Sequence, residues 1–138
     1  MIHYRSEEEI DLIRESSLLV ARTHAEIVGM IKPGVSSLAL DQRAEEFIRD
    51  NGGMPAFKGY NGFPNTLCVS PNEQVVHGIP NNNSLQEGDI LSIDCGVLMN
   101  GYYGDSAFTH EIGDVCSEIK KLLQVTKEAL YKGIEMAI

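Results

Sequence analysis

The sequence has few cysteines and no long apolar run, and both features narrow the classes of protein to which it can belong. Its three cysteines, Cys68, Cys95 and Cys116, are odd in number and include no C-x-x-C pair. This usage favours reduced thiols over a disulfide framework. The first ten residues lack the apolar core of a signal peptide, and no apolar run approaches the roughly 20 residues that span a bilayer. We therefore expect a cytoplasmic protein with no membrane partner.

Basic residues are scarce as well. The chain has 11 Lys and Arg against 20 Asp and Glu, which gives a formal net charge of -9. A surface this acidic repels phosphate groups, so nucleic acid and anionic membranes are disfavoured as the main partner. The same charge favours a cationic ligand, for example the free amino terminus of a polypeptide.

Several catalytic motifs are also missing. The sequence contains no G-x-S-x-G elbow, no H-E-x-x-H pair and no phosphate-binding G-x-x-x-x-G-K-[ST] loop. Serine hydrolases and single-zinc proteases therefore have no support. No repeat, low-complexity tract or linker interrupts residues 1–138, whose length and 43% hydrophobic content suit one domain with a single core.

Apolar residues at intervals of three and four predict helices in three parts of the chain. The first helix begins at the capping box formed by Ser6 and Glu9, and Pro33-Gly34 ends it. His24 lies on its apolar stripe, where a packed histidine is a simpler interpretation than a ligand. A second helix follows Ser36 or Ser37 and ends at residues 51–53.

The third predicted helix follows Gly113-Asp114 and has a broad apolar face. Asp114 is a candidate N-cap for it. Between the second and third helices lie a loop with three aromatic residues at 54–64, a short strand at 66–70 and an extended piece at 75–80. His77 lies in that extended piece, where we expect an extended backbone and a fixed ring.

Asn100-Gly101, between two apolar runs, predicts a β-hairpin, because a type I′ turn needs two residues with positive φ. In this register Met99 faces Tyr102, and Asp94 and Asp105 become diagonal neighbours on one face. Their β-carbons then lie about 7–8 Å apart, close enough for their carboxylates to share a cation. A one-residue bulge would send them to opposite faces. Alternatively, the two aspartates face solvent or cap a turn.

Four segments together resemble the type I methionine aminopeptidases of bacteria. They are G-Y-N-G-F-P at 59–64, N-T-L-C-V-S-P-N-E-Q-V-V-H-G-I-P at 65–80, E-G-D-I-L-S-I-D-C-G at 87–96 and N-G-Y-Y-G-D-S at 100–106. The resemblance implies an α/β fold of the pita-bread type, in which two related halves enclose a metal site. This chain corresponds to the N-terminal half, with long helices packed on an antiparallel sheet.

The resemblance also implies roles for individual residues. Asp94 and Asp105 match metal ligands, with Asp105 bridging two divalent ions. His77 matches a catalytic histidine that also contacts the scissile amide of the substrate. The pocket for the methionine side chain is implied for the following four residues: Phe57, Tyr60, Phe63 and Cys68. Some relatives carry a smaller residue where this chain has Phe57.

The implied reaction is removal of the N-terminal methionine from nascent polypeptides by a hydroxide that bridges two metal ions. Oxygen and imidazole ligands suit Mn, Fe(II), Co or Zn. The family's remaining ligands, a His and two Glu, belong to a second half that this sequence does not contain. None of His110, Glu111, Glu128 and Glu135 matches those motifs, so we expect the chain to be inactive alone.

Two other functions share the fold. X-prolyl peptidases and creatinase-like hydrolases also carry two spaced aspartates on such a hairpin, although the N-x-x-C-x-S-x-N-E segment joined to V-V-H-G-I-P argues against them. A non-catalytic binding module is the third possibility. Such a module has little need of Asp94, Asp105 and His77 together, yet all three are present.

Overall fold

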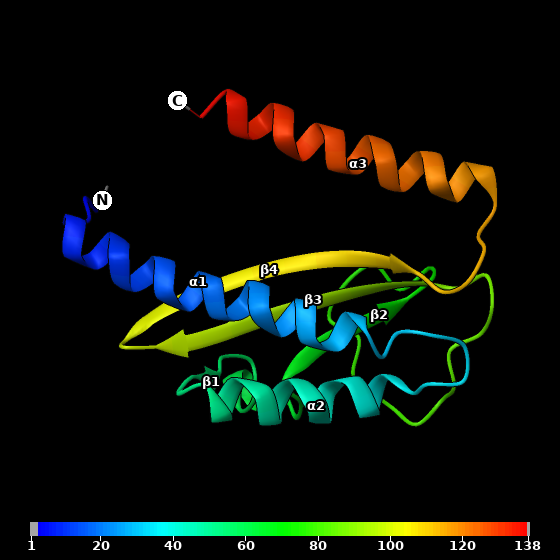
Figure 1. The fold of residues 1–138 in the computed structure, drawn as a ribbon, viewed down its shortest axis with the longest axis horizontal. Helices are drawn as coiled ribbons and strands as arrows, with labels where there is room; N and C mark the ends of the chain where they lie inside the picture. Colours follow the sequence, from blue (N-terminus) through cyan, green and yellow to red (C-terminus); the bar gives the residue numbers. More distant parts are fainter. Residues whose placement is uncertain (1–2, 138) are drawn as a thin grey trace.

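The computed structural model describes residues 3–137, in which helices flank an antiparallel sheet (Figure 1). A short 3-10 turn at Tyr60–Gly62 follows the first strand. The elements are α1 (Glu7–Val28), α2 (Ser37–Asp50), β1 (Met54–Pro55), β2 (Leu67–Pro71), β3 (Ile90–Met99), β4 (Tyr102–Glu111) and α3 (Ser117–Glu135). This mixture of helices and antiparallel strands confirms the predicted fold class.

Strand β3 is the centre of the sheet. It pairs with β4 along one edge and with β1 and β2 along the other, always antiparallel. The β3–β4 register runs without interruption from Met99↔Tyr102 to Ile90↔Glu111. Asn100 and Gly101 have φ values of 52° and 82°, as a type I′ turn requires. The predicted hairpin and its register are confirmed.

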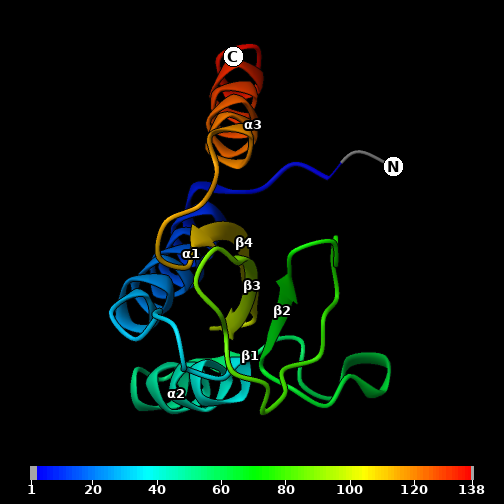
Figure 2. The ribbon, with the colours of Figure 1, turned by 90° about the vertical axis from the view of Figure 1, so that its right-hand side faces the viewer.

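The two faces of the sheet have different neighbours. On one face Leu91, Ile93, Cys95 and Val97 of β3 are fully buried against α1 and α2, and Figure 2 shows both helices on that side. Burying each large apolar side chain of this layer stabilises the fold by roughly 1.5–3 kcal/mol. The residues between these four, including Asp94 and Gly96, point to the other face, beside the loops that flank β2.

Helix α1 begins as predicted, and both hydrogen bonds of the capping box between Ser6 and Glu9 are present. It ends at Val28, before the predicted stop at Pro33-Gly34. Gly29 follows it, and the N–H of Met30 donates to the carbonyl of Ile27 in a tighter turn. Helix α2 has the predicted Ser36 N-cap.

Helix α3 differs from the prediction in two ways. It begins after Cys116, and Asp114 does not cap it, because the Asp114 carboxylate instead accepts from Lys120 Nζ at 2.5 Å. No α3 side chain within 117–135 is buried, and Figure 1 shows the helix set off from the sheet. Its apolar face, which includes Leu122 and Leu130, is therefore exposed.

Candidate metal and peptide site

A cavity of about 550 Å³ lies on the sheet face opposite α1 and α2. All seven candidate residues from the sequence line it: Phe57, Tyr60, Phe63, Cys68, His77, Asp94 and Asp105. They come from β2, β3, β4 and two loops. A larger hollow of about 760 Å³ between β4 and α3 contains none of them. The fold therefore gathers the predicted residues in one place.

The acidic pair has the geometry that the turn predicts. Asp94 lies opposite Ala107 on β4 and opposite Cys68 on β2, whereas Asp105 lies opposite Gly96. Because directly opposed residues share a face and residues two apart also share it, Asp94 and Asp105 project to the same side. Asp94 is half-buried and Asp105 is exposed to the cavity mouth. The alternative with a bulge is thereby excluded.

The electrostatics of Asp94 fit a cation. Burial, and next the negative charge of Asp105, raise the pKa of the Asp94 carboxyl to about 6. Its Oδ1 atom is buried and lacks a hydrogen-bond partner within residues 3–137. A buried carboxylate oxygen of this kind is costly unless it is paired or ligates a metal. A divalent ion between Asp94 and Asp105 would remove both the repulsion and the unpaired oxygen.

The ligand set within residues 3–137 is incomplete for a metal centre. Across this range, His, Cys, Asp and Glu side chains form no group of three or more that could hold an ion. A pair of aspartates thus supplies two carboxylates and no third ligand. Most protein-bound divalent ions need more protein ligands than this, or several bound waters.

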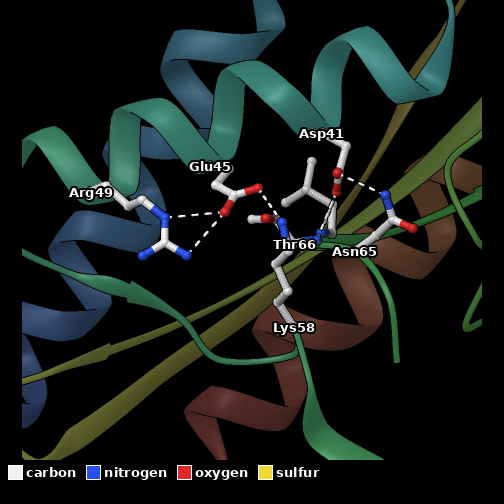
Figure 3. A network of polar contacts seen from close by, with 7 residues as sticks. Asp41, Glu45, Arg49, Lys58, Asn65 and Thr66 are labelled. Atoms are coloured by element: carbon white, nitrogen blue, oxygen red, sulfur yellow. Dashed lines mark hydrogen bonds and ion pairs between the residues drawn. The ribbon is translucent and has the colours of Figure 1, made fainter. Parts of the chain in front are cut away.

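The aromatic loop between β1 and β2 is held at both ends by α2 (Figure 3). Near its start, Lys58 pairs with Glu45 at 2.6 Å. At its end, the buried Asp41 carboxylate accepts from the backbone N–H groups of Thr66 and Leu67, at 2.9 and 2.8 Å, and from the Asn65 side chain. Asp41 and Glu45 are one helical turn apart, so one face of α2 sets the position of the whole loop.

His77 does not have the predicted extended backbone. Its φ is 60°, its side chain is exposed, and residues 75–80 form no strand. The cause is the next residue. Gly78 donates its N–H to Ser70 Oγ at 3.0 Å and accepts from the Val69 N–H at 2.9 Å. A β-carbon at Gly78 would lie 2.1 Å from the Val69 carbonyl oxygen, so only glycine fits. The hydrogen bonds of Gly78 with β2 thus fix the position of His77 at the cavity.

Cys68 contributes a neutral wall to the cavity. Burial, with smaller contributions from Asp94 and Asp105, raises the pKa of its thiol to about 11. At neutral pH the group is therefore a protonated thiol, which behaves as a small apolar side chain. This agrees with a pocket for an uncharged side chain.

His24 lies away from the cavity. It is buried between α1 and β4, and its Nε2 lies 3.0 Å from the Ser106 carbonyl oxygen. Its ring is next to Phe108, with centroids 6.4 Å apart. The packed interpretation of His24 is confirmed.

Sequence reasoning missed the residues that support the site. Asp41 is the clearest case, and a pattern could have found it. It lies three and seven positions before Ala44 and Ile48, on the apolar face of α2, where a carboxylate needs partners. Gly78 and Gly96 carry no comparable pattern, because their role depends on neighbours that are distant in the sequence.

Comparison with known proteins agrees with this geometry. Residues 11–138 match metallopeptidase family M24. The chain is 51% identical over 137 residues to methionine aminopeptidase 1 of Bacillus subtilis, covering 99% of this chain and 55% of that protein. It is 50% identical over 133 residues to the methionine aminopeptidase of Borreliella burgdorferi, covering 96% and 53%. The chain thus spans about half the length of the curated relatives it matches.

Solved structures give the same result. The methionine aminopeptidase of Rickettsia prowazekii superposes with a TM-score of 0.95 at 39% identity, over 97% of this chain and 54% of that one. That of Thermotoga maritima gives 0.95 at 37%, over 99% and 55%. The Xaa-Pro dipeptidase of Bacillus anthracis shares the fold, with a TM-score of 0.81 at 22% identity, over 94% and 35%. The expected pita-bread fold is confirmed, and the chain belongs to metallopeptidase family M24.

Proposed function

We propose that this chain carries part of the active site of a methionine aminopeptidase, which removes the N-terminal methionine from nascent polypeptides. The observation that carries the proposal is the cavity that unites an acidic pair, a histidine and an apolar wall. Relatives at up to 51% identity that are named methionine aminopeptidases support the substrate. Such a substrate is met in the cytoplasm.

Asp94 and Asp105 are the proposed metal ligands, and two divalent ions are the proposed cofactor. Bound there, the ions lower the pKa of water and polarise the peptide carbonyl. Asp94 and Asp105 would hold the cations in the cavity, next to the free amine of the bound substrate. His77 donates a hydrogen bond to the scissile amide, and the phenyl and thiol groups of Phe63 and Cys68 enclose the methionine side chain.

The remaining ligands, a His and two Glu, are proposed to come from polypeptide beyond this chain. Two facts support this: the chain covers about 55% of its relatives, and no third ligand joins Asp94 and Asp105 within residues 3–137. The chain, supplied with Mn²⁺, is therefore expected to release no methionine from a Met-Ala-Ser peptide. Release at a steady rate would show that the ligands present suffice.

The test of the metal site is calorimetric titration of the 138-residue chain with Mn²⁺ at pH 7.5. We expect weak but measurable binding that Asp94→Asn reduces at least about tenfold, as loss of a metal-site residue commonly does. Asp50→Asn, a change at the exposed end of α2, is the matched control and should leave the titration unchanged. Equal binding by the wild type and the Asp94 variant would refute the proposed site.

The X-prolyl peptidases remain the competing class because they share the fold. Their similarity to this chain is near 22% identity, well below that of the methionine aminopeptidases. Nuclear magnetic resonance titration with Met-Ala-Ser and with Ala-Pro-Ser, each in the presence of Zn²⁺, separates the two classes. Preference for the proline peptide would overturn the proposed specificity.

A further inference from the structure

The Phe57 ring fills the space that a side chain at position 96 would occupy. Gly96 is buried on the cavity face of β3, and the Phe57 ring lies directly on it. A β-carbon built at Gly96 would lie 2.4 Å from Cε1 and 2.8 Å from Cζ of that ring. Carbon atoms in contact are about 3.5–4.0 Å apart, so the ring fills the volume that any other side chain at position 96 needs.

The backbone that carries Phe57 has little freedom to move away from Gly96. The N–H of Ala56 donates to the Gly96 carbonyl at 2.9 Å, and Pro55 pairs with Val97. On the other side of Phe57, Lys58 is paired with Glu45 of α2. Because the backbone is anchored just before and just after Phe57, a side chain at position 96 would turn the ring rather than shift the loop.

This contact lies next to the acidic pair. Gly96 is the register partner of Asp105 and is two residues from Asp94, so all three share one face of the sheet. Phe57 lines the same cavity as both aspartates. The ring is therefore one of the walls beside a substrate side chain whose amino group lies next to Asp94 and Asp105.

We propose that Gly96 is a specificity-determining residue, because only glycine at this position lets the Phe57 ring lie directly against β3 and leave the cavity wide enough for an unbranched side chain. The inference rests on the proposed function, since it names what sets the accepted side chain. A residue larger than glycine at position 96 turns the ring into the cavity and narrows it. Loss of the ring widens the cavity and admits aromatic side chains.

The first test needs no ligand. In a double-mutant cycle, Gly96→Ala lowers the melting temperature by about 5 °C, because it overpacks against the ring. In the Phe57→Ala background the same substitution changes it by no more than about 1 °C. Gly133→Ala, where the β-carbon meets nothing within 4 Å, is the glycine control. An equal loss with and without the ring would refute the contact and the inference.

The second test measures side-chain preference. L-methioninamide and L-phenylalaninamide are titrated into each variant with Zn²⁺ present and followed by nuclear magnetic resonance. We expect Phe57→Ala to strengthen phenylalaninamide binding by about tenfold, and Gly96→Ala to weaken methioninamide binding by about tenfold. The double variant should bind methioninamide more tightly than Gly96→Ala does.

The outcomes separate this inference from the proposed function. If methioninamide binds to the wild type but neither substitution changes the preference, only the role of Gly96 is overturned. If no variant binds methioninamide, the proposed substrate is overturned and this inference with it.

Discussion

At the scale of single residues, Asp41 supports the site without touching the cavity. Its Oδ1 accepts two backbone N–H groups, from Thr66 and Leu67, and its Oδ2 accepts the Asn65 side chain. The carboxylate is 3% exposed, so these bonds are shielded from water. They fix the residue at which the aromatic loop becomes β2, and therefore the position of Cys68.

Removal of this carboxylate leaves two buried N–H groups without an acceptor. Asp41→Ala is expected to lower the free energy of unfolding by about 3 kcal/mol, since each unpaired buried donor costs roughly 1–3 kcal/mol. Asp41→Asn keeps one acceptor oxygen and should cost less. Urea denaturation of both variants, with Asp50→Asn as a surface control, measures the difference. Equal stability of the alanine variant and the wild type would contradict the structure.

His110 makes the stability of the folded chain depend on pH. Burial, followed by the electrostatic effect of nearby His24, lowers the pKa of His110 below its usual 6.5. The folded state therefore binds fewer protons than the unfolded state below about pH 6.5, and stability must fall as the pH drops through that range. We expect His110→Gln to lose less stability than the wild type between pH 7.5 and pH 5.5 in urea denaturation. His3→Gln, an exposed change, is the control.

At the scale of elements, the packing of α1 on β4 positions the acidic hairpin. Ser16 of α1 is fully buried, and its hydroxyl donates to the carbonyl of Tyr102 beside the turn, at 2.9 Å. Gly104 of β4 lies against the same helix turn, and a β-carbon there would meet the backbone of Ser16 and Ser17 at about 2.6 Å. Helix and hairpin are therefore in direct backbone contact.

This contact predicts opposite effects for two glycines. Gly104→Ala should lower the free energy of unfolding by about 2–3 kcal/mol, because helix backbone cannot move aside as a side chain can. Gly133→Ala, on exposed α3, should cost nothing or raise stability by about 0.5–1 kcal/mol through helix propensity. Thermal unfolding of the two variants is the measurement. A tolerated Gly104→Ala would mean that α1 and β4 are less closely packed.

Sequence patterns predicted the elements whose cause is local. Ser6 and Glu9 specify the start of α1, and Asn100-Gly101 specifies the hairpin and with it the common face of the two aspartates. The conformation of His77 could not be predicted, because it depends on hydrogen bonds between Gly78 and β2. The exposure of α3 could not be predicted either, because an apolar stripe indicates a helix but does not show which element covers it.

At the scale of the whole molecule, α3 is the element with the least support. Its side chains are unburied within 117–135, whereas β3 lies in the middle of the core. Within residues 3–137, no helix is long and apolar enough to cross a membrane. The exposed apolar face of α3 thus belongs to a helix that no other element within residues 3–137 buries.

Amide hydrogen exchange should reveal this difference. Local opening requires little energy where few apolar contacts are broken, so α3 amides are expected to exchange much faster than those of β3. Mass spectrometry of peptic peptides from residues 90–99 and 117–135 measures the two rates in one sample. Protection of α3 as strong as that of β3 would show that the helix is covered in solution.

The anchoring of the aromatic loop on α2 also affects how fast and how tightly a ligand could bind. Lys58 and Thr66 are tied to the helix, and within the loop the Tyr60 N–H donates to the Phe57 carbonyl and the Phe63 N–H to the Tyr60 carbonyl. A ligand that enters the cavity then orders only a few residues. The entropy lost on association is correspondingly small, because folding has already restricted the rest of the loop.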